Sequence, residues 1–326
     1  MKFTGLRCSG FVVLIGCCIT MPLASTATAT VATWMQLSPV AYPPARSYLA
    51  MTYDAAIGKI IMFGGYDGVT YLNDTWLFDG VSWTRAIGSR LSPGPRANAQ
   101  MAYDSVTHKV VLFGGYNGTR YLGDTWIWDG TTFQWTCAYT PHSPPAVTGP
   151  MLFPDPNGRV DVYGGFDGQF YQVTMWQWNG SDWTQLDPPM VPYARSSAPV
   201  ATNPVTREVV MFGGLADVNP INTWTYNGIT WSMRSPRTQP DWVYGASAAF
   251  DPHLRAIVMF GGGSGGVDQN TTWRWIISNW EQLLTTRAPE PREGFGMAYL
   301  PTLGHVVIFG GQDNEAPLND TWELIP

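Results

Sequence analysis

Four arginines recur at related positions along the chain and are the side chains best suited to hold a charged ligand. Each follows a proline-containing segment, and their separations are close to 50 residues or twice that: Arg46, Arg96, Arg195 and Arg292. A guanidinium group presents a planar fork of donors that matches a carboxylate in a bidentate contact. The four residues therefore predict a carboxylate-binding ring, unless each arginine pairs with an aspartate of a neighbouring repeat or with a backbone carbonyl.

Further ligand-binding candidates lie close to these arginines. Alternation along an extended strand places the second residue after each arginine on the same side, which gives Tyr48, Asn98, Ser197 and Gly294. Three aromatic residues in glycine-containing loops are the better surface candidates for a ligand rim: Tyr66, Tyr116 and Phe166. Three tyrosines five residues further along are expected to pack between repeats instead: Tyr71, Tyr121 and Tyr171.

Catalytic chemistry has a weak basis in the sequence. The only acids beside one of these arginines are Glu290 and Glu293, which flank Arg292 and could carry protons in a sugar-acid isomerase or lyase. A solvated Pro-Arg-Glu loop is the alternative interpretation. No His-Glu-x-x-His or Cys-x-x-Cys motif occurs, and we expect no metal and no cofactor.

All these residues belong to a repeat of about 50 residues. Its anchor is an aromatic residue followed by two glycines, and six copies lie 48 to 50 residues apart, at 63–65, 113–115, 163–165, 212–214, 260–262 and 309–311. A tryptophan follows each anchor, and in four copies a second one comes seven residues later; in the second copy Phe133 holds that place and Trp135 follows it. A fixed period of this length predicts an array of similar supersecondary units.

Each repeat has the pattern of four short strands. In the first copy the turn 54–58 joins the segments 46–53 and 59–63, and the hairpin signal Asp79-Gly80 joins 75–78 and 82–85. Such a sheet is apolar on both faces, and packing six of them radially covers both. We therefore predict an all-β chain with one domain over residues 30–326, a six-bladed β-propeller with four antiparallel strands per blade. Its tight turns lie on one face, and the long loops that carry the candidate ligand residues lie on the other.

The two ends of this domain are expected to meet in one blade. The sixth repeat stops after its third strand, whereas Trp34 stands 12 residues before Arg46, as Trp183 stands 12 before Arg195. We therefore expect the strand that contains Trp34 to complete the last blade, which leaves no free sheet edge between the first and last blades.

The glycine pair, a tyrosine six residues later and a tryptophan five after that resemble the kelch repeat, from about Trp34 to the end of the chain. Three copies carry the whole pattern, and the later three have Asn219, Asp268 and Pro317 at or near the tyrosine position. The resemblance implies the propeller fold but says little about activity, because kelch propellers include protein-binding adaptors, sialic acid isomerases and copper-containing galactose oxidases.

The resemblance also implies roles for single residues. In kelch adaptors a ring of arginines at the channel mouth holds acidic peptides, and in the isomerases arginines help to hold the sugar carboxylate. The oxidases need two histidines, two tyrosines and a cysteine on copper. Here Cys137 lies near Tyr139 and His142, but no second loop histidine exists, so copper chemistry is not expected.

The first 29 residues predict where the protein acts, and its charge limits the partners that we expect. Lys2 and Arg7 precede an apolar run and a small-residue cleavage motif, which predicts an export signal over residues 1–29; a lipoprotein anchored through Cys17 is the alternative. The apolar run is too short to span a membrane. Without that signal the formal charge is 16 − 24 = −8, and no basic cluster occurs, which argues against nucleic-acid partners.

The sequence thus predicts a secreted or periplasmic, monomeric, non-catalytic binding module. Its ligand is a protein segment or a glycan held on the long-loop face by the four arginines, Tyr48, Asn98 and the loop aromatics. The alternative is a sugar-acid isomerase or lyase that uses the arginine-lined funnel, with Glu293 or Glu290 as the proton carrier.

Overall fold

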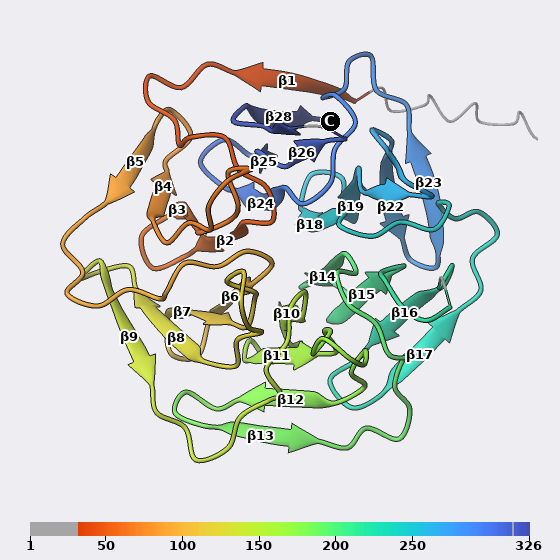
Figure 1. The fold of residues 1–326 in the computed structure, drawn as a ribbon. Helices are drawn as coiled ribbons and strands as arrows, with labels where there is room; N and C mark the ends of the chain where they lie inside the picture. Colours follow the sequence, from red (N-terminus) through yellow and green to blue (C-terminus); the bar gives the residue numbers. More distant parts are fainter. Residues whose placement is uncertain (1–31, 219, 315) are drawn as a thin grey trace, which may run out of the picture.

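The chain forms a closed wheel of six β-sheets around a central axis (Figure 1). The computed structural model describes residues 32–218, 220–314 and 316–326, so the expected export signal lies outside the described residues. Within these ranges there is no helix, and hence none long and apolar enough to cross a membrane. The predicted six-bladed propeller with four antiparallel strands per blade is confirmed.

Each blade runs from an innermost strand at the axis to an outermost strand at the rim. Blade 1 contains β2 (Ala50–Asp54), β3 (Lys59–Phe63), β4 (Thr75–Phe78) and β5 (Trp83–Ala86). Blade 2 contains β6 (Gln100–Asp104), β7 (Lys109–Phe113), β8 (Thr125–Asp129) and β9 (Gln134–Ala138). Blade 3 contains β10 (Met151–Pro154), β11 (Val160–Tyr163), β12 (Met175–Trp178) and β13 (Trp183–Leu186).

The second half of the wheel repeats this order. Blade 4 contains β14 (Val200–Asn203), β15 (Glu208–Phe212), β16 (Thr223–Tyr226) and β17 (Trp231–Arg234). Blade 5 contains β18 (Ser247–Asp251), β19 (Ala256–Phe260), β22 (Thr272–Ile276) and β23 (Asn279–Leu283). Blade 6 contains β24 (Gly296–Leu300), β25 (His305–Phe309), β28 (Thr321–Ile325) and, from the start of the described chain, β1 (Thr33–Leu37). Two small hairpins lie in the long loops of blades 5 and 6, β20–β21 (Gly263–Ser264, Val267–Asp268) and β26–β27 (Gln312–Asp313, Ala316–Pro317).

Both faces of every sheet are buried against neighbouring blades, as the sequence predicts. In β3 the residues Ile60 to Phe63 are all fully buried. Their side chains alternate between two cores: Ile60 and Met62 pack toward blade 6, and Ile61 and Phe63 pack toward blade 2. A blade outside the wheel would expose both apolar faces, so the ring is the smallest unit that buries them.

The paired glycines allow adjacent blades to approach backbone to backbone. Gly64 and Gly65 have φ values of 65° and 105°, which lie in the left-handed region. A Cβ on Gly64 would lie 2.6 Å from the carbonyl oxygen of Arg96, and one on Gly65 would lie 2.9 Å from that of Ser47. The Gly65 N–H donates to the same Arg96 carbonyl at 2.9 Å, so the glycine pair joins blade 1 to blade 2. Side chains at these two positions would separate the blades.

A ring of tryptophan indoles joins the outer strands to the preceding blades. In five blades an indole N–H donates to a threonine hydroxyl, in the pairs Trp34–Thr272, Trp83–Thr321, Trp135–Thr75, Trp183–Thr125 and Trp280–Thr223. In blade 4 Trp231 meets the sulfur of Met175 instead. In blade 2 the residue seven positions after Trp126 is Phe133, but a longer turn brings Trp135 into the ring instead. Phe133 stands 41% exposed at φ 55° in the turn before β9.

The predicted joining of the chain ends in one blade is confirmed. β1 pairs antiparallel with β28, with Trp34 opposite Leu324 and Gln36 opposite Trp322. Trp34 is fully buried and reaches into blade 5 through its bond to Thr272. Figure 1 shows β1 as the rim strand of the blade that contains the C-terminus.

Candidate functional site

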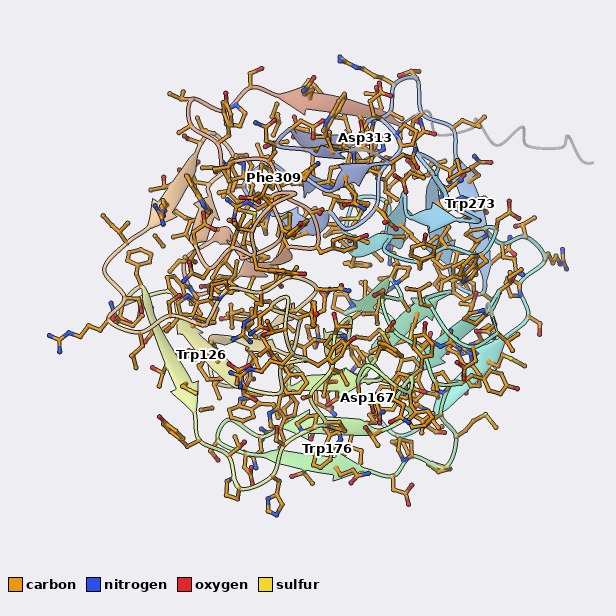
Figure 2. The ribbon with its side chains drawn as sticks, viewed as in Figure 1. Trp126, Asp167, Trp176, Trp273, Phe309 and Asp313 are labelled. Carbon is orange, nitrogen blue, oxygen red and sulfur yellow. The ribbon has the colours of Figure 1, made fainter. Side chains whose placement is uncertain are left out.

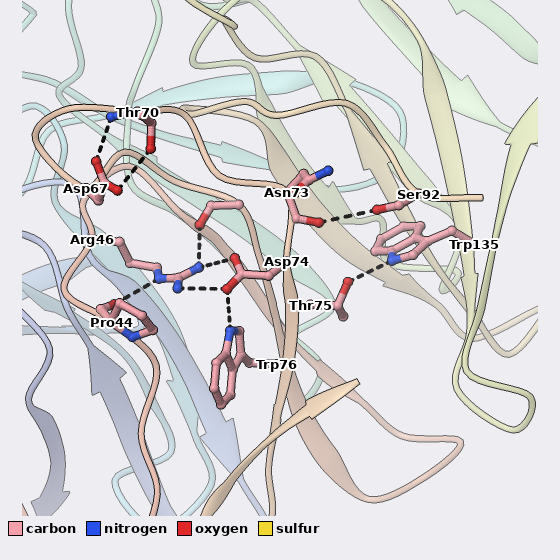
Figure 3. Close-up of polar contacts among 11 residues, drawn as sticks. Pro44, Arg46, Asp67, Thr70, Asn73, Asp74, Thr75, Trp76, Ser92 and Trp135 are labelled. Atoms are coloured by element: carbon pink, nitrogen blue, oxygen red, sulfur yellow. Dashed lines mark hydrogen bonds and ion pairs between the residues drawn. The ribbon is translucent and has the colours of Figure 1, made fainter. Parts of the chain in front are cut away.

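The predicted ligand-binding arginines are held inside the blades. Arg46 is fully buried, and its guanidinium donates to both carboxylate oxygens of Asp74, at 2.5 and 3.0 Å, and to the carbonyls of Gly64 and Pro44 (Figure 3). The same carboxylate accepts the indole N–H of Trp76 at 2.7 Å. Burial acts to raise the pKa of Asp74, but the hydrogen bonds and charge of Arg46 outweigh it and hold that pKa below its ordinary value.

This arrangement recurs wherever the arginine recurs. Arg96 pairs with Asp124 and Arg292 with Asp320 in the same bidentate way, and Arg195 bonds to Asn222. Blades 3 and 5 carry Val147 and Val243 instead, and there the acid position is Thr174 or Thr271. Arginine and its partner are therefore present together or absent together, which supports a structural role. All four arginines thus pair within the protein, each with a glycine carbonyl of its own blade. The aspartate partners also lie in the arginine's own blade, and not in a neighbouring one as expected from the sequence.

A closed ring of backbone hydrogen bonds narrows the long-loop end of the central channel. One residue from each blade takes part, and each N–H donates to the carbonyl of its predecessor around the wheel at 2.5 to 3.0 Å. The six members are Tyr48, Asn98, Gly149, Ser197, Gly245 and Gly294, and all have φ between 52° and 64°. Backbones joined by hydrogen bonds lie about 5 Å apart, so the six residues form a hexagon with sides of about 5 Å. The corners of a regular hexagon lie one side length from its centre, which places the ring about 5 Å from the channel axis. We call this end of the channel the mouth.

Two predicted ligand-binding residues, Tyr48 and Asn98, belong to this ring. Three members are glycines, which adopt a positive φ without strain, whereas a tyrosine in this region is unusual. The ring hydrogen bonds hold Tyr48 there as they hold Asn98 and Ser197, and its side chain has partners as well: its hydroxyl donates to Glu293 Oε1 at 2.5 Å and accepts from Gln312 Nε2 at 3.1 Å. Local backbone strain held by specific contacts is a feature of binding and catalytic sites.

Glu293, one of the two predicted acids, lies against this ring, and Glu290 does not. Glu293 is 7% exposed, and burial, together with the nearby charge of Asp268, raises its pKa despite the hydrogen bonds from Tyr48 and Gln312. Glu290 is exposed in the link before blade 6 and contributes its backbone carbonyl to Arg292. The structure thus brings Tyr48 and Glu293 together across the junction of blades 1 and 6.

The loop aromatics of blades 1 to 3 form one continuous row on the long-loop face. Neighbouring ring centroids are 5.0 to 6.0 Å apart, and the contacts alternate between pairs within one loop and edge-to-face pairs between blades. The row, which we call the aromatic belt, consists of Tyr66, Tyr71, Tyr116, Tyr121, Phe166 and Tyr171. All six rings are half-buried, so each keeps part of its surface open to a ligand.

Two hollows accompany the mouth and the belt. The central channel encloses about 900 Å³ and is lined mainly by apolar side chains of the innermost strands, among them Met51, Met101 and Met297. A groove of about 540 Å³ lies beside the belt in blade 2, between Gly94–Arg96 and the loop that carries Arg120 and Tyr121. Figure 2 shows the side chains that fill the blades, with Trp126, Trp176 and Trp273 in the outer halves of their blades.

Comparison with known proteins assigns the family. The family model of the KLHDC2/KLHL20/DRC7 Kelch-repeats domain matches residues 23–214, which is more than half of the chain. The chain belongs to the kelch-repeat family. No curated protein matches it.

The repeated positions of the sequence predict some residues of the site but not others. The arginine pattern does not predict the ring members Gly149 and Gly245, because their blades carry valine at the arginine position. Tyr244, Asp268 and Gln312 also contribute to the surroundings of Glu293. One signal was present in the sequence: the second position after each arginine or valine carries only tyrosine, asparagine, serine or glycine.

Proposed function

We propose that this protein is an exported, non-catalytic binding module that recognises an extended protein segment on the long-loop face of blades 1 to 3. The observation that supports this most directly is the aromatic belt. Aromatic rings give large contact areas at a low cost in side-chain entropy, and tyrosine is enriched where proteins bind other proteins. Six rings in a row suit a segment that lies across three blades better than a small compact ligand.

The loops that carry the belt are held in place before any ligand binds. Asp67 Oδ1 accepts from the backbone N–H groups of Val69 and Thr70, and Asn117 and Asp167 do the same in blades 2 and 3. A Cβ on Gly118 would lie 2.8 Å from the ring of Tyr71, so the loop of blade 2 packs directly against the tyrosine of blade 1, and Gly168 of blade 3 packs in the same way against Tyr121. Such preorganisation lowers the entropic cost of binding.

The four arginines do not enter this proposal as ligand contacts. Their guanidinium groups are engaged by Asp74, Asp124, Asn222 and Asp320. The enzymatic alternative loses its support for the same reason, because a sugar-acid isomerase needs free cations to hold the carboxylate of its substrate. Of the predicted ligand residues, Tyr66, Tyr116 and Phe166 remain as belt contacts, and Tyr48 and Asn98 remain at the mouth.

Export is part of the proposal and rests on the sequence of residues 1–29 alone. Mass spectrometry of the protein from its native host tests it. Cleavage after a residue between 25 and 29 supports a secreted protein, a diacylglyceryl group on Cys17 supports the lipid-anchored alternative, and an intact Met1 contradicts both.

The belt can be tested by removing two of its rings. We expect the Tyr66→Ala/Tyr116→Ala double variant to lose peptide affinity roughly tenfold or more, because hot-spot aromatics dominate such contacts. The measurement is a peptide array and a glycan array, each probed with wild type and variant, followed by titration of the best peptides. Phe133→Ala is the matched control, since it removes an exposed aromatic from the opposite face.

The outcomes separate the competing ligands. Peptide binding that falls in the double variant and persists in Phe133→Ala supports the proposal. Peptide binding that is equal in all three proteins contradicts it, and a belt-dependent signal on glycans alone would assign the belt to sugars. Thermal unfolding of each variant checks that the blades remain closed.

A further inference from the structure

Blades 5 and 6 replace the aromatic belt with acidic groups near the mouth. In blades 1 to 3 the residue after the arginine or valine position pairs with a belt aromatic across a β-bridge, as Ser47 does with Tyr66. In blade 5 the pair is Tyr244 with Gly263, and in blade 6 it is Glu293 with Gln312. The small hairpins β20–β21 and β26–β27 occupy the place of the belt loops, and Figure 2 shows Asp313 over blade 6.

Two nearly buried carboxyl groups approach each other in this half of the face. Glu293 is 7% exposed and Asp268 is 9% exposed. Glu293 Oε2 has no hydrogen-bond partner among the described residues, and a Cβ on Gly263 would lie 2.8 Å from this oxygen and 2.8 Å from the ring of Tyr244. Asp268 lies directly opposite Gly263 in the hairpin β20–β21. The free oxygen is therefore directed toward Gly263 and Tyr244, and Asp268 is near enough for its charge to act on Glu293.

No basic side chain of the described chain forms an ion pair with either acid. The groups that face Glu293 are acidic or neutral: Asp268 from β21, Tyr48 from the mouth ring, Gln312 from β26 and Tyr244. Burial raises the pKa of both carboxyl groups, and the charge of Asp268 raises that of Glu293 further. Glu293 accepts hydrogen bonds from Tyr48 and Gln312, and Asp268 accepts one from the backbone N–H of Asn314, but these neutral donors bring no counter-charge. A proton, or a cation that enters from outside, would supply it.

We propose that Glu293, Asp268, Tyr48 and Tyr244 form a pocket for an organic cation, the ammonium or guanidinium group of a basic residue in the bound segment. Glu293 Oε2 is the acceptor for such a group, because Oε1 already accepts from Tyr48 Oη and from Gln312 Nε2. The rings of Tyr48 and Tyr244 add cation–π attraction at the same place. We call these four residues the cation pocket.

The cation pocket and the aromatic belt lie along one path. Tyr48 belongs to blade 1, whose loop begins the belt, and its hydroxyl reaches Glu293 in blade 6. A segment whose basic residue enters the pocket can therefore continue across the belt of blades 1 to 3. This inference rests on the proposed function for its partner, but the pocket can be tested with a small probe that does not need the belt.

The probe is N-acetyl-lysine-N-methylamide, with the uncharged norleucine analogue as its match, titrated by NMR at pH 7.5 and low salt. We expect the lysine probe to bind and the norleucine probe to bind at least tenfold more weakly. Glu293→Gln keeps the shape but removes the charge, and it should weaken the lysine probe about ten- to hundredfold, the range of a charge-assisted hydrogen bond. Binding should also weaken as the pH falls and Glu293 takes up a proton.

Glu290→Gln is the control, because this exposed acid stands three residues away in the same loop. An equal loss in both variants would show diffuse attraction and overturn the pocket, as would unchanged binding in Glu293→Gln. If Glu293→Gln does not fold, Asp268→Asn replaces it with the same expected loss. Failure of the lysine probe beside intact belt-dependent peptide binding overturns this inference alone. Probe binding without any peptide ligand overturns the proposed function alone.

Discussion

At the scale of single residues, the four arginines show how a repeat stabilises a charged side chain in its interior. The buried guanidinium groups of Arg46, Arg96 and Arg292 each have a carboxylate and carbonyls as partners, whereas Arg195 has carbonyls and the amide of Asn222. Removal of one partner of a buried ion pair leaves an uncompensated charge. Blades 3 and 5 solve the same packing problem with valine and threonine. The arginine–aspartate pair is thus exchanged as a unit in blades 3 and 5, while blade 4 keeps the arginine and replaces the aspartate with Asn222.

This exchange can be tested in blade 1. Arg46→Val leaves Asp74 buried without its partner, so we expect a loss of about 3 to 5 kcal/mol in the free energy of unfolding. The double variant Arg46→Val/Asp74→Thr recreates the combination of blades 3 and 5 and should recover at least half of that loss. Urea unfolding of the single and double variants measures the coupling. Arg120→Ala, an exposed arginine, serves as the control and should change little. If the double variant were as unstable as Arg46→Val, the arginine and the aspartate would not be exchangeable as a pair.

At the scale of elements, β1 carries more stability than its five residues suggest. It buries Trp34 completely and covers the edge of β28. Deletion of residues 33–37 removes that indole, a change that by itself costs about 3 to 5 kcal/mol, and exposes a sheet edge that other chains can pair with. We expect a lower melting temperature and concentration-dependent association, measured by calorimetry and analytical ultracentrifugation. Met35→Ala, on the 42% exposed side of the same strand, should behave like wild type. Unchanged melting of the deletion would show that the blades close without β1.

The strands and their order could be predicted because the signals are local and repeated. The anchor glycines, the two tryptophans and the turn residues fix each strand within a few positions, and β3 and β4 match their predicted ranges. The mouth ring could not be predicted, since a positive φ at Tyr48 comes from contacts with Gly294 and Glu293, which lie almost 250 residues away in the chain. Residue spacing alone could not predict that Trp135 takes the place of Phe133 in the indole ring. The turn before β9 is longer, so the indole keeps its place in the sheet although its distance from Trp126 in the sequence changes.

At the scale of the whole molecule, near-symmetry in the scaffold coexists with asymmetry on its surface. Glycine pairs, the indole ring and the mouth ring involve every blade, whereas the aromatic belt is confined to blades 1 to 3 and the cation pocket to blades 5 and 6 with Tyr48. Closure thus fixes where the two surfaces lie relative to each other. A ligand that contacts both the aromatic belt and the cation pocket therefore depends on the order of the blades around the ring, and not on any single repeat.

One departure from symmetry lies in the core and links stability to pH. Asp161 in β11 stands where the other blades carry isoleucine or valine, and it is fully buried. Its Oδ1 accepts from Gln177 at 2.9 Å, and burial raises its pKa from 3.8 to about 8. The folded state therefore holds a proton that the unfolded state releases above about pH 4. This proton stabilises the fold at low pH, and the contribution is lost as the pH rises toward 8.

We expect the free energy of unfolding of wild type to fall between pH 5 and pH 8 relative to Asp161→Asn, by up to roughly 1.4 kcal/mol per pH unit. Asparagine keeps the bond to Gln177 but cannot ionise, so the variant should have the flatter profile and be the more stable protein at pH 8. Urea unfolding at pH 5, 6, 7 and 8 measures both. Asp79→Asn is the matched control: blades 3 and 4 carry asparagine at that turn, and the pKa of Asp79 is lowered, so it titrates below this range. Parallel profiles for wild type and Asp161→Asn would mean that Asp161 is ionised in the folded protein and that the space between blades 3 and 4 contains a counter-charge or water.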